Sequence, residues 1–579
     1  MILQSLAQYY DVLKDEGKVP HFGWSKVRVS FALGIDEDGS LINIIPLKQE
    51  EQQGNKKKEM PSEMIVPEQV KKASGIVSNF LCENSSYLLG CDKGEITKRS
   101  MECFNMCKRH HEELLADVDS KAAKAVLAFF KNWDPHLTKG HPIVDMYYDE
   151  IVNSANLVFR FDGRFVQDDL SVQKAWDNHQ ADSGISMSCL VTGNTLPVAR
   201  LHPSIKGVNG AQTMGASLVS FNAEAYKSYG KEQSYNAPVS EKATFAYTTT
   251  LNYLLSDRAH RTIVGDTTIV YWAKSGQEAY QDFLGMTAFG AGSNNISQQE
   301  LHDIMEHIAN GKAVELDDTT LSGDEQFFIL GLAPNAARLS VRFFLQDSFG
   351  NFIKKLKEHY DRLSIVRPSY EKTEFLPLWR LLKETVNEKS RDKSANPLMG
   401  GAVVRSILNG TFYPAALLNG TLIRIRAERK ITYGRAAILK AYWLLNGSKT
   451  IKEVLTVSLN EESNYTPYVM GRLFSVLEAL QEAANPGINA TIRDKYFNSA
   501  CATPAVIFPM LLKLSNSHMR KLEKKYQVYY SQQITRLMGK LDAEKLFPAR
   551  LSQEEQGAFI IGYYHQTQKR YQKKEQGGE

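Results

Sequence analysis

The sequence contains few cysteines and no apolar run that approaches the roughly 18–20 residues needed to cross a bilayer. Six cysteines are scattered over 579 residues, a pattern that favours reduced thiols over a disulfide framework. The first residues, MILQSLAQYYDVL, are typical of a short amphipathic helix. They lack the basic start and the small-residue cleavage site of a signal peptide. We therefore expect a cytoplasmic protein with no membrane partner.

Familiar catalytic and cofactor motifs are missing as well. There is no phosphate loop, no H-E-x-x-H zinc motif and no G-x-S-x-G elbow, and Gly207, Gly210 and Gly215 are not spaced as a dinucleotide fingerprint. Cys103 and Cys107 precede two histidines, but their spacing is not a standard zinc arrangement, and two cysteines on a helix is the simpler interpretation. We expect no catalytic residue, no metal and no cofactor.

Two residue pairs leave an enzymatic alternative open. His302 and Asp303 are adjacent, as in some metal-dependent phosphohydrolases, so the alternative function is a metal-dependent nuclease. Both residues lie off the apolar stripe of the helix predicted at 297–311, where a surface position is the simpler interpretation. His202 and Lys206 offer an acid–base pair, but no carboxylate lies near them in the sequence.

The order of strand and helix patterns predicts the fold class. Apolar residues make up 43% and charged residues 23% of the chain, which is ordinary for a globular protein of two to four domains. A hairpin is predicted over 24–46, and helical periods dominate from about residue 350. We expect an α+β protein with a mixed α/β N-terminal domain at 1–350, a helical connecting region at 351–465 and a four-helix C-terminal bundle at 466–579.

Charge is distributed unevenly. From Thr491 to the end, 15 Lys and Arg stand against 8 Asp and Glu, whereas the whole chain carries only +4. This asymmetry predicts contact with a polyanion near the C-terminus. In the same part, HMRKLEKKYQVYY and YYHQTQKRYQKK combine basic residues with tyrosine, which suits single-stranded nucleic acid, although a solvated helix face is the competing interpretation. Residues 48–61, KQEEQQGNKKKEMP, are predicted to form a surface loop or edge excursion.

Two non-repetitive segments are dense in the residues that contact nucleic acid. Lysine neutralises phosphate, asparagine and glutamine can donate and accept at a base edge, and glycine lets the backbone approach a strand. The candidate DNA contacts of the first segment, at 71–90, are Lys71, Lys72, Ser74, Asn79 and Asn84. Those of the second segment are Lys206, Asn209 and Gln212. The same residue types also form turns and helix caps, so that alternative stays open for both segments.

A third candidate lies in LIRIRAERK, where Arg424 and Arg426 alternate along a stretch that we interpret as extended chain. Together with Arg429 and Lys430 they form a predicted phosphate track. An exposed charged face without a ligand is the competing interpretation.

Several longer stretches together resemble one known family. They are SGIVSNFLCENSSYLLG, CLVTGNTLPVARLHPSIKGVNGAQTMGASLVSFN, SYGKEQSYNAPVSEKATFAYTTTLNYLL and LAPNAARLSVRFF. These stretches are similar to the Csd-type large subunit of the subtype I-C CRISPR surveillance complex, Cascade. The resemblance runs from the first residues to the C-terminal helices and so covers nearly the whole chain.

The resemblance implies a function without catalysis. Such a subunit recognises the protospacer-adjacent motif (PAM) in double-stranded DNA, helps to unwind the target, stabilises the R-loop and docks the helicase–nuclease that cuts. The implied partners are the guide RNA (crRNA) ribonucleoprotein, the Cascade backbone subunits, the handle-binding subunit, small subunits, PAM-bearing target DNA and the recruited helicase–nuclease. Within this frame Lys71 and Lys72 would hold phosphate, and Asn79 and Asn84 would reach base edges or separate the first base pair. A scaffold subunit without DNA contact remains a further alternative.

The resemblance also implies an internal start that yields a separate small subunit from the C-terminal bundle. Met470 opens a helical period at MGRLFSVLEALQ and is the candidate start, with a product spanning residues 470–579.

Overall fold

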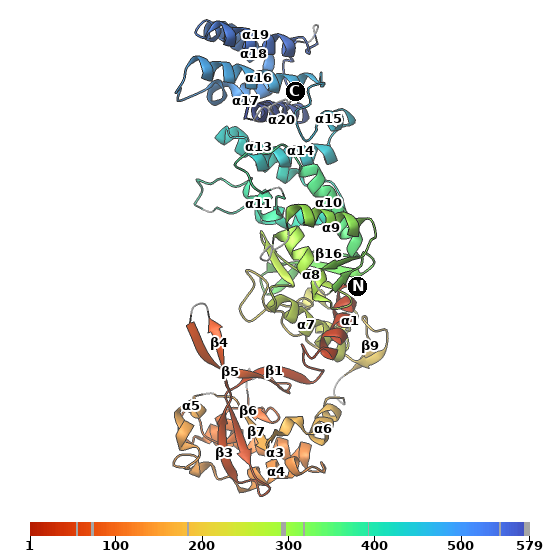
Figure 1. Ribbon diagram of the computed structural model, residues 1–579. Helices are drawn as coiled ribbons and strands as arrows, with labels where there is room; N and C mark the ends of the chain where they lie inside the picture. The colour runs from red at the N-terminus through yellow and green to blue at the C-terminus, as the bar shows by residue number, and fades with distance from the viewer. Residues whose placement is uncertain are drawn as a thin grey trace. The chain divides into compact units, whose positions relative to one another are not determined.

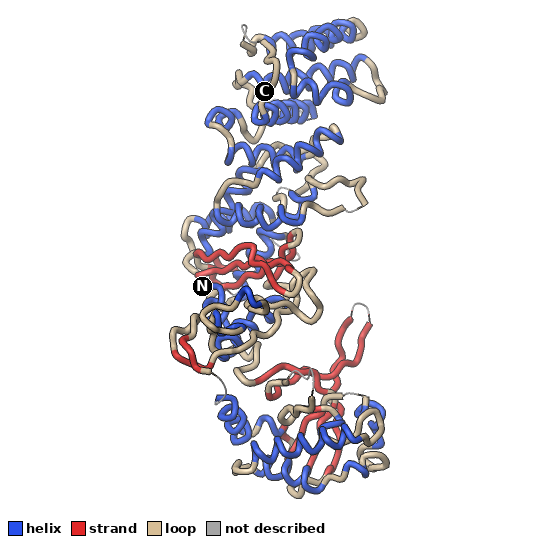
Figure 2. The backbone as a smooth tube through the Cα atoms, turned by 180° about the vertical axis from the view of Figure 1, so that it is seen from behind, coloured by secondary structure: helices blue, strands red, loops and turns tan. Residues whose placement is uncertain are grey.

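The structure is a computed structural model, and it describes residues 1–53, 56–70, 75–153, 155–181, 185–290, 297–316, 319–373, 375–391, 393–542 and 546–571. Figures 1 and 2 show the course of the chain with its helices and strands. The contacts within the chain divide it into two compact units. Unit 1 comprises residues 1–203 and 219–253, and unit 2 comprises residues 204–218 and 254–579. The fold is α+β, as predicted, and after Ser348 the described residues contain helices and no further strand.

Unit 1 combines short strands with helices of one to five turns. Its elements are α1 (Ile2–Asp15), β1 (Trp24–Val29), β2 (Phe31–Ile35), β3 (Leu41–Pro46), β4 (Lys48–Gln53), β5 (Lys56–Pro67), β6 (Cys82–Glu83), α2 (Ser85–Leu88), α3 (Lys98–Leu115), α4 (Lys121–Asn132), α5 (Tyr148–Val152), β7 (Leu157–Phe161), β8 (Arg164–Phe165), α6 (Leu170–Ala181), β9 (Ser186–Ser188), β10 (Thr195–Pro197) and most of α7 (Glu241–Ser256).

The core of unit 1 is a mixed sheet with the strand order β3-β2-β7-β6, and β8 pairs with β7. Strand β2 is antiparallel to β3, which confirms the predicted hairpin for residues 31–46, and parallel to β7, with Phe31 opposite Leu157. The first predicted residues, 24–29, form β1 and pair with β5 instead. Every residue of β2 is buried, as expected of a strand covered on both faces. Phe129 and Phe130 of α4 contact Phe159 of β7 edge to face, at centroid distances of 5.2 and 5.8 Å.

Residues 48–53 and 56–61 form paired β-strands. Strand β4 is antiparallel to β5, with Lys48 opposite Pro61, and β5 continues along β1, where Trp24 lies opposite Pro67. Because the strand order is β1-β5-β4, β4 occupies a sheet edge. The predicted edge position is therefore right and the predicted loop conformation is wrong. Lysine, glutamate and glutamine favour strands weakly, so backbone pairing with a long partner decides the conformation here.

Unit 2 contains an antiparallel sheet followed by helices. Its elements are β11 (Arg261–Val264), β12 (Thr267–Ala273), α8 (Glu278–Leu284), α9 (Gln298–Ala309), β13 (Val314–Leu316), β14 (Thr319–Leu321), β15 (Gln326–Asn335), β16 (Arg338–Ser348), α10 (Phe349–Leu363), α11 (Leu378–Lys383), α12 (Pro397–Asn409), α13 (Ala415–Glu428), α14 (Tyr433–Asn446), α15 (Lys449–Val454), α16 (Thr466–Ala484), α17 (Ile492–Ala502), α18 (Pro504–Met519), α19 (Lys524–Met538) and α20 (Gln553–Tyr571).

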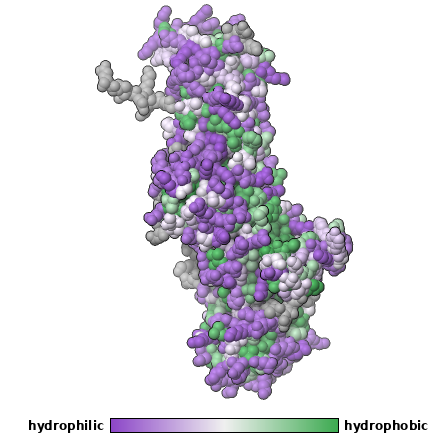
Figure 3. Space-filling view, turned by 90° about the vertical axis from the view of Figure 1, so that its right-hand side faces the viewer, coloured by the Kyte–Doolittle hydropathy of each residue, from purple (hydrophilic) through white to green (hydrophobic). Residues whose placement is uncertain are grey.

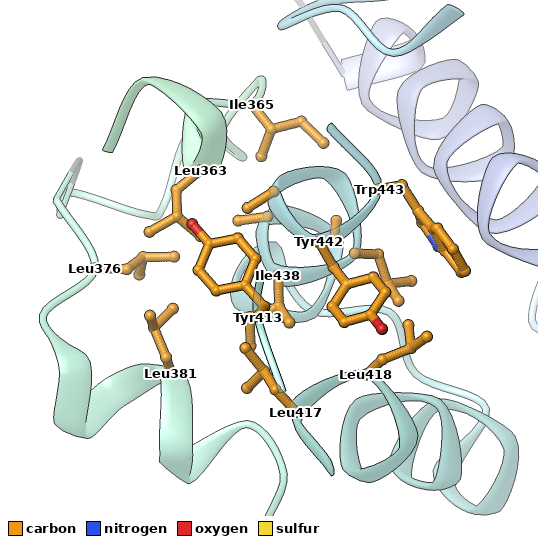
Figure 4. Close-up of a cluster of buried hydrophobic side chains, with 14 of the residues drawn as sticks. Leu363, Ile365, Leu376, Leu381, Tyr413, Leu417, Leu418, Ile438, Tyr442 and Trp443 are labelled. Atoms are coloured by element: carbon orange, nitrogen blue, oxygen red, sulfur yellow. The ribbon is translucent and has the colours of Figure 1, made fainter. Parts of the chain in front are cut away.

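The sheet of unit 2 has the strand order β11-β12-β15-β16, and β12 is buried at every position. In the helical part that follows, α14 lies at the centre of a cluster of buried apolar side chains (Figure 4). In this view Leu381 of α11 and Leu417 of α13 point toward α14, which contributes Ile438, and all three are buried. Trp443 of α14 lies on the side of α20, where its indole fills the space beside Gly557. This apolar packing stabilises the helical part that carries several of the candidate sites.

Helices α16 and α20 approach each other at two glycines. A Cβ on Gly471 would lie 2.0 Å from the carbonyl oxygen of Phe559, and a Cβ on Gly562 would lie 2.2 Å from that of Tyr468. Only glycine permits backbones to come this close. Within the described residues of 466–571 there are five helices, α16 to α20, rather than the predicted four.

The predicted domain limits fall close to changes in secondary structure. The last strand ends at Ser348 and α10 follows directly, while α16 begins at Thr466. The two compact units divide the chain at other residues. The three-part division at 1–350, 351–465 and 466–579 therefore stays a prediction.

The surface is mostly hydrophilic on the side shown in Figure 3, with smaller hydrophobic patches between. Among the described residues, no helix has both the length and the apolar content to span a membrane.

Candidate nucleic-acid interface

The polar segment at residues 204–218, called the 204–218 loop below, has a defined shape although it forms no helix or strand. Ile205 and Ala216 are buried, and their backbones exchange two hydrogen bonds of 2.9 Å. The N–H of Ser217 donates to the carbonyl of Ala337 at 3.0 Å, beside the start of β16. The two ends of the loop are therefore paired with each other, and Ser217 joins its C-terminal end to the start of β16.

Two glycines let the loop pack closely. Gly215 has a φ of +93°, and a Cβ there would lie 2.8 Å from the carbonyl oxygen of Ile205. Gly207 has a φ of +89°, and its Cβ would lie 3.2 Å from Leu255. L-residues rarely adopt these angles, so glycine is required at both positions. In the isolated chain, both glycines allow a close approach to the protein's own backbone.

The loop displays the three predicted contacts of the second segment together. Lys206, Asn209 and Gln212 are all exposed. The backbone N–H of Asn209 donates to the hydroxyl of Thr268 on β12 at 2.9 Å, so the loop is held at its middle as well as at its ends. A fixed loop with an ammonium group and two amides can neutralise a phosphate and pair with base edges.

Asn79, a predicted base contact, is only 6% exposed and is hydrogen-bonded inside unit 1. Its Oδ1 accepts from the N–H of Val70 at 2.8 Å, and its Nδ2 donates to Gln69 at 2.7 Å. Its own N–H donates to Glu83 at 2.9 Å. Both ends of the amide are thus engaged, and the geometry gives Asn79 the turn-forming role that the sequence left as the alternative.

Of the other candidates of the first segment, the structure describes Asn84. Asn84 is the N-cap of α2, and its Oδ1 accepts from the N–H of Ser86 at 3.1 Å, which is again the alternative role for asparagine. Lys71, Lys72 and Ser74 lie outside the described residues. Their phosphate contacts stay predictions.

A buried histidine fixes this segment to helix α3. The Nε2 atom of His111 accepts a hydrogen bond from the N–H of Leu81 at 3.0 Å, and Nδ1 lies 2.8 Å from the carbonyl oxygen of Cys107. The proton therefore sits on Nδ1 and the ring is neutral. Burial lowers the pKa of His111 to about 3. Cys103 and Cys107 are buried cysteines of the same helix, which is the simpler interpretation of their spacing.

The predicted phosphate track lies on helix α13 and its end, so the prediction of extended chain is wrong. Apolar residues at three- and four-residue spacing make this stretch helical, and Arg424 and Arg426 point to different sides of the helix. Arg424 forms an ion pair within the helix, and Arg426 donates to a glutamine of α20. Arg429 ends the helix with a φ of +52°, and Lys430 follows it; both are exposed.

Helix α19 presents the predicted combination of basic residues and tyrosine. Lys524, Lys525, Tyr526 and Tyr529 are exposed. The two lysines occupy the first turn, directly after the N-cap residue Glu523. Their ammonium groups can neutralise phosphates, and the neighbouring rings can stack on unpaired bases.

The residues of the enzymatic alternative are at the surface or paired internally. On α9, His302 lies 3.8 Å from Glu306, and Asp303 accepts from a glutamine one turn earlier. His202 is buried, and its Nδ1 lies 2.6 Å from the hydroxyl of Tyr247. In the part of the chain that the structure describes, no group of three or more His, Cys, Asp or Glu is arranged to hold a metal.

Sequence reasoning missed a groove in unit 2 that contains Trp379, Lys383 and Lys430. These residues come from α11 and from the connection between α13 and α14, which are far apart in the sequence. One local signal was available. In LPLWRLLK the leucines form the buried side of a helix, and Trp379 lies off that side.

A comparison with protein families identifies nearly the whole chain. Residues 6–571 match the family model described as CRISPR-associated protein (Cas_Csd1). The chain therefore belongs to this family of CRISPR-associated proteins, which confirms the resemblance to the Csd-type large subunit of Cascade. No curated protein matches the chain.

Proposed function

We propose that this Cascade-type subunit is the non-catalytic large subunit of a type I-C effector. In this proposal it recognises the PAM in double-stranded DNA, helps to unwind the target, stabilises the R-loop and docks the helicase–nuclease. Family membership supports the assignment to a CRISPR effector complex. The proposal for PAM reading by this chain depends mainly on one structural observation, the exposed and fixed 204–218 loop.

The loop suits duplex recognition for two physical reasons. Its hydrogen bonds to Thr268 and Ala337 hold the backbone before any ligand binds, so less conformational entropy is lost on binding. Asn209 and Gln212 offer amides that can donate and accept at a base edge, and Lys206 offers a cation for the adjacent phosphate. This division of roles fits a protein that reads a short motif while base pairing reads the target.

The exposed face of α19 supports the second part of the proposal. Its lysines and tyrosines suit a single strand, which is the form of the DNA strand displaced when an R-loop opens. We assign the remaining partners from the family: the guide RNA ribonucleoprotein, the backbone and handle-binding subunits, small subunits, and a helicase–nuclease that supplies the cleavage activity.

Gel shifts test the proposal. The isolated chain and the assembled complex are each titrated with matched duplexes that contain or lack the PAM. Preferential binding of the PAM duplex by the complex is expected, and equal binding of the two duplexes would contradict the proposal. The same preparation, incubated with DNA and manganese, should leave the DNA intact. Cleavage that is lost in the His302→Ala variant would instead support the nuclease alternative.

A further inference from the structure

The groove that the sequence did not reveal lies between α11 and the connection from α13 to α14, and its volume is about 460 Å³. This volume falls within the roughly 300–1,000 Å³ of small-ligand sites. Its lining includes Trp379 and Lys383 of α11, and Lys430 and Thr432 of the connection. All of these residues belong to unit 2.

Several polar residues that line the groove form hydrogen bonds with one another. Arg435 is 4% exposed and donates to Glu428 at 2.6 Å and to the carbonyl oxygen of Lys430 at 3.0 Å. The hydroxyl of Thr432 donates to Glu384 at 2.6 Å. Because Glu384 and Glu428 are both engaged, neither presents an unpaired carboxylate to a ligand.

The groove is also lined by a large aromatic side chain that is exposed to solvent. Of the six tryptophans, Trp24, Trp176, Trp272 and Trp443 are buried and Trp133 is partly buried, whereas Trp379 is 55% exposed. Its Nε1 edge is directed toward Gly290, 3.6 Å from where a Cβ would be. Exposed indole surface costs about 25 cal/mol per Å² relative to buried surface. A planar ring stacked on Trp379 would recover that free energy.

The charges that remain unpaired favour an anionic ligand. Lys383 and Lys430 are exposed, and neither forms an ion pair with any residue that the structure describes. Arg380 is paired with Glu371. Glu388 also lines the groove and is exposed. Two cations against one carboxylate leave a net positive rim around an aromatic surface.

We propose that this groove binds one unstacked nucleotide of a single-stranded nucleic acid. The base stacks on Trp379, and Lys383 and Lys430 hold the phosphates on either side of it. This inference rests on the proposed function, which brings single-stranded nucleic acid to the chain, and it adds a specific base-binding site in the helical part. A ring and two cations select a nucleotide over a simple anion, because a phosphate alone would leave the indole exposed.

Tryptophan fluorescence of the full chain tests the inference, because Trp379 is the most exposed of the six. Acrylamide quenching is measured with and without a 20-mer of deoxythymidine, and with an abasic 20-mer that has phosphates but no bases. The deoxythymidine 20-mer should protect the accessible tryptophan from acrylamide, and the abasic 20-mer should not. In Trp379→Phe, a conservative variant expected to fold, the accessible component and its protection should both disappear.

Affinity provides the second measurement. Trp379→Ala should weaken binding of the deoxythymidine 20-mer about 5- to 150-fold, the range that loss of one stacked base produces. A Lys383→Glu/Lys430→Glu variant should lose the protection of Trp379. Absence of protection in the natural chain, whether or not the oligonucleotide binds, would overturn the inference. PAM preference is measured in a different experiment, the gel shift with duplex DNA. A negative result with the single-stranded 20-mers would therefore overturn this inference without deciding the test of the proposed function.

Discussion

The backbone N–H of Asn209 donates a hydrogen bond of 2.9 Å to the hydroxyl of Thr268, and this bond fixes the middle of the 204–218 loop on strand β12. Thr268 is fully buried. In the Thr268→Val variant the N–H of Asn209 loses its acceptor, at a local cost of about 1–3 kcal/mol. We expect faster amide hydrogen exchange at Asn209 and several-fold weaker binding of the PAM duplex by the assembled complex.

The matched control is Thr268→Ser, which keeps the hydroxyl and should retain both the slow exchange and the affinity. Slow exchange at Asn209 together with natural affinity in Thr268→Val would show that the bond does not organise the loop.

The close contact of α16 and α20 predicts a position that tolerates no side chain. In Gly562→Ala the new Cβ would meet the carbonyl oxygen of Tyr468 at 2.2 Å, so the two helices must separate. Overpacking of this kind costs about 1–3 kcal/mol. Urea unfolding of the full chain should show this loss. Gly539→Ala is the control, because its nearest neighbour lies at 3.4 Å, and an equal effect of both variants would contradict the account.

Buried neutral histidines predict loss of stability in acid. Burial lowers the pKa of His111 to about 3, below the roughly 6.5 of an unfolded chain. Between these values the unfolded state binds the additional proton, so the stability contribution is complete above pH 6.5 and falls as the pH drops toward 3. His359 and His565 behave alike, because burial lowers the pKa of each to about 3.

Each of these histidines should contribute about 1.4 kcal/mol per pH unit to the slope of unfolding free energy between pH 4 and 6. His111→Gln should remove one such contribution in unit 1. His136→Gln, at an exposed position, is the control and should keep the natural slope. A slope that is the same in all three proteins would contradict the assignment of a neutral His111.

Met470 is fully buried in the second turn of α16, and its role as an internal start stays a prediction. Met470→Leu conserves volume and should leave the full chain folded while a short product of residues 470–579 disappears from purified complex. Met519→Leu, farther along the same part, should leave that product in place. Mass spectrometry of the complex decides, and a short product of unchanged size in Met470→Leu would exclude this start.

Local signals predicted much of the fold. The helix at 297–311 begins at Ser297, whose side chain accepts from the N–H of Glu300, and ends where Gly311 has a φ of +75°. The Asp162–Gly163 turn between β7 and β8 likewise consists of residue types that favour tight turns. In each case the residues that define the element are neighbours in the chain, so their pattern is complete within a short window.

The errors arose where distant contacts decide. The alternation at Arg424 and Arg426 imitates a strand, but the apolar spacing of the wider segment forms α13. The charged residues at 48–53 and 56–61 form strands because β4 pairs with β5, which in turn pairs with β1. In the candidate interface, the exposure of each asparagine side chain decides whether it is available for a contact with DNA. Asn79 and Asn209 are the same residue type, and only the fold shows that one is buried and the other exposed.

The central claim is that amides on the 204–218 loop read the PAM, and gel shifts with variant complexes test it most directly. In Asn209→Ala/Gln212→Ala, the preference for the PAM duplex over its PAM-less match should fall about 5- to 150-fold, as expected for loss of a specific base contact. In Lys206→Ala, both duplexes should bind more weakly to the same extent, with the salt slope reduced by about one. An unchanged PAM preference in the double amide variant would contradict the account.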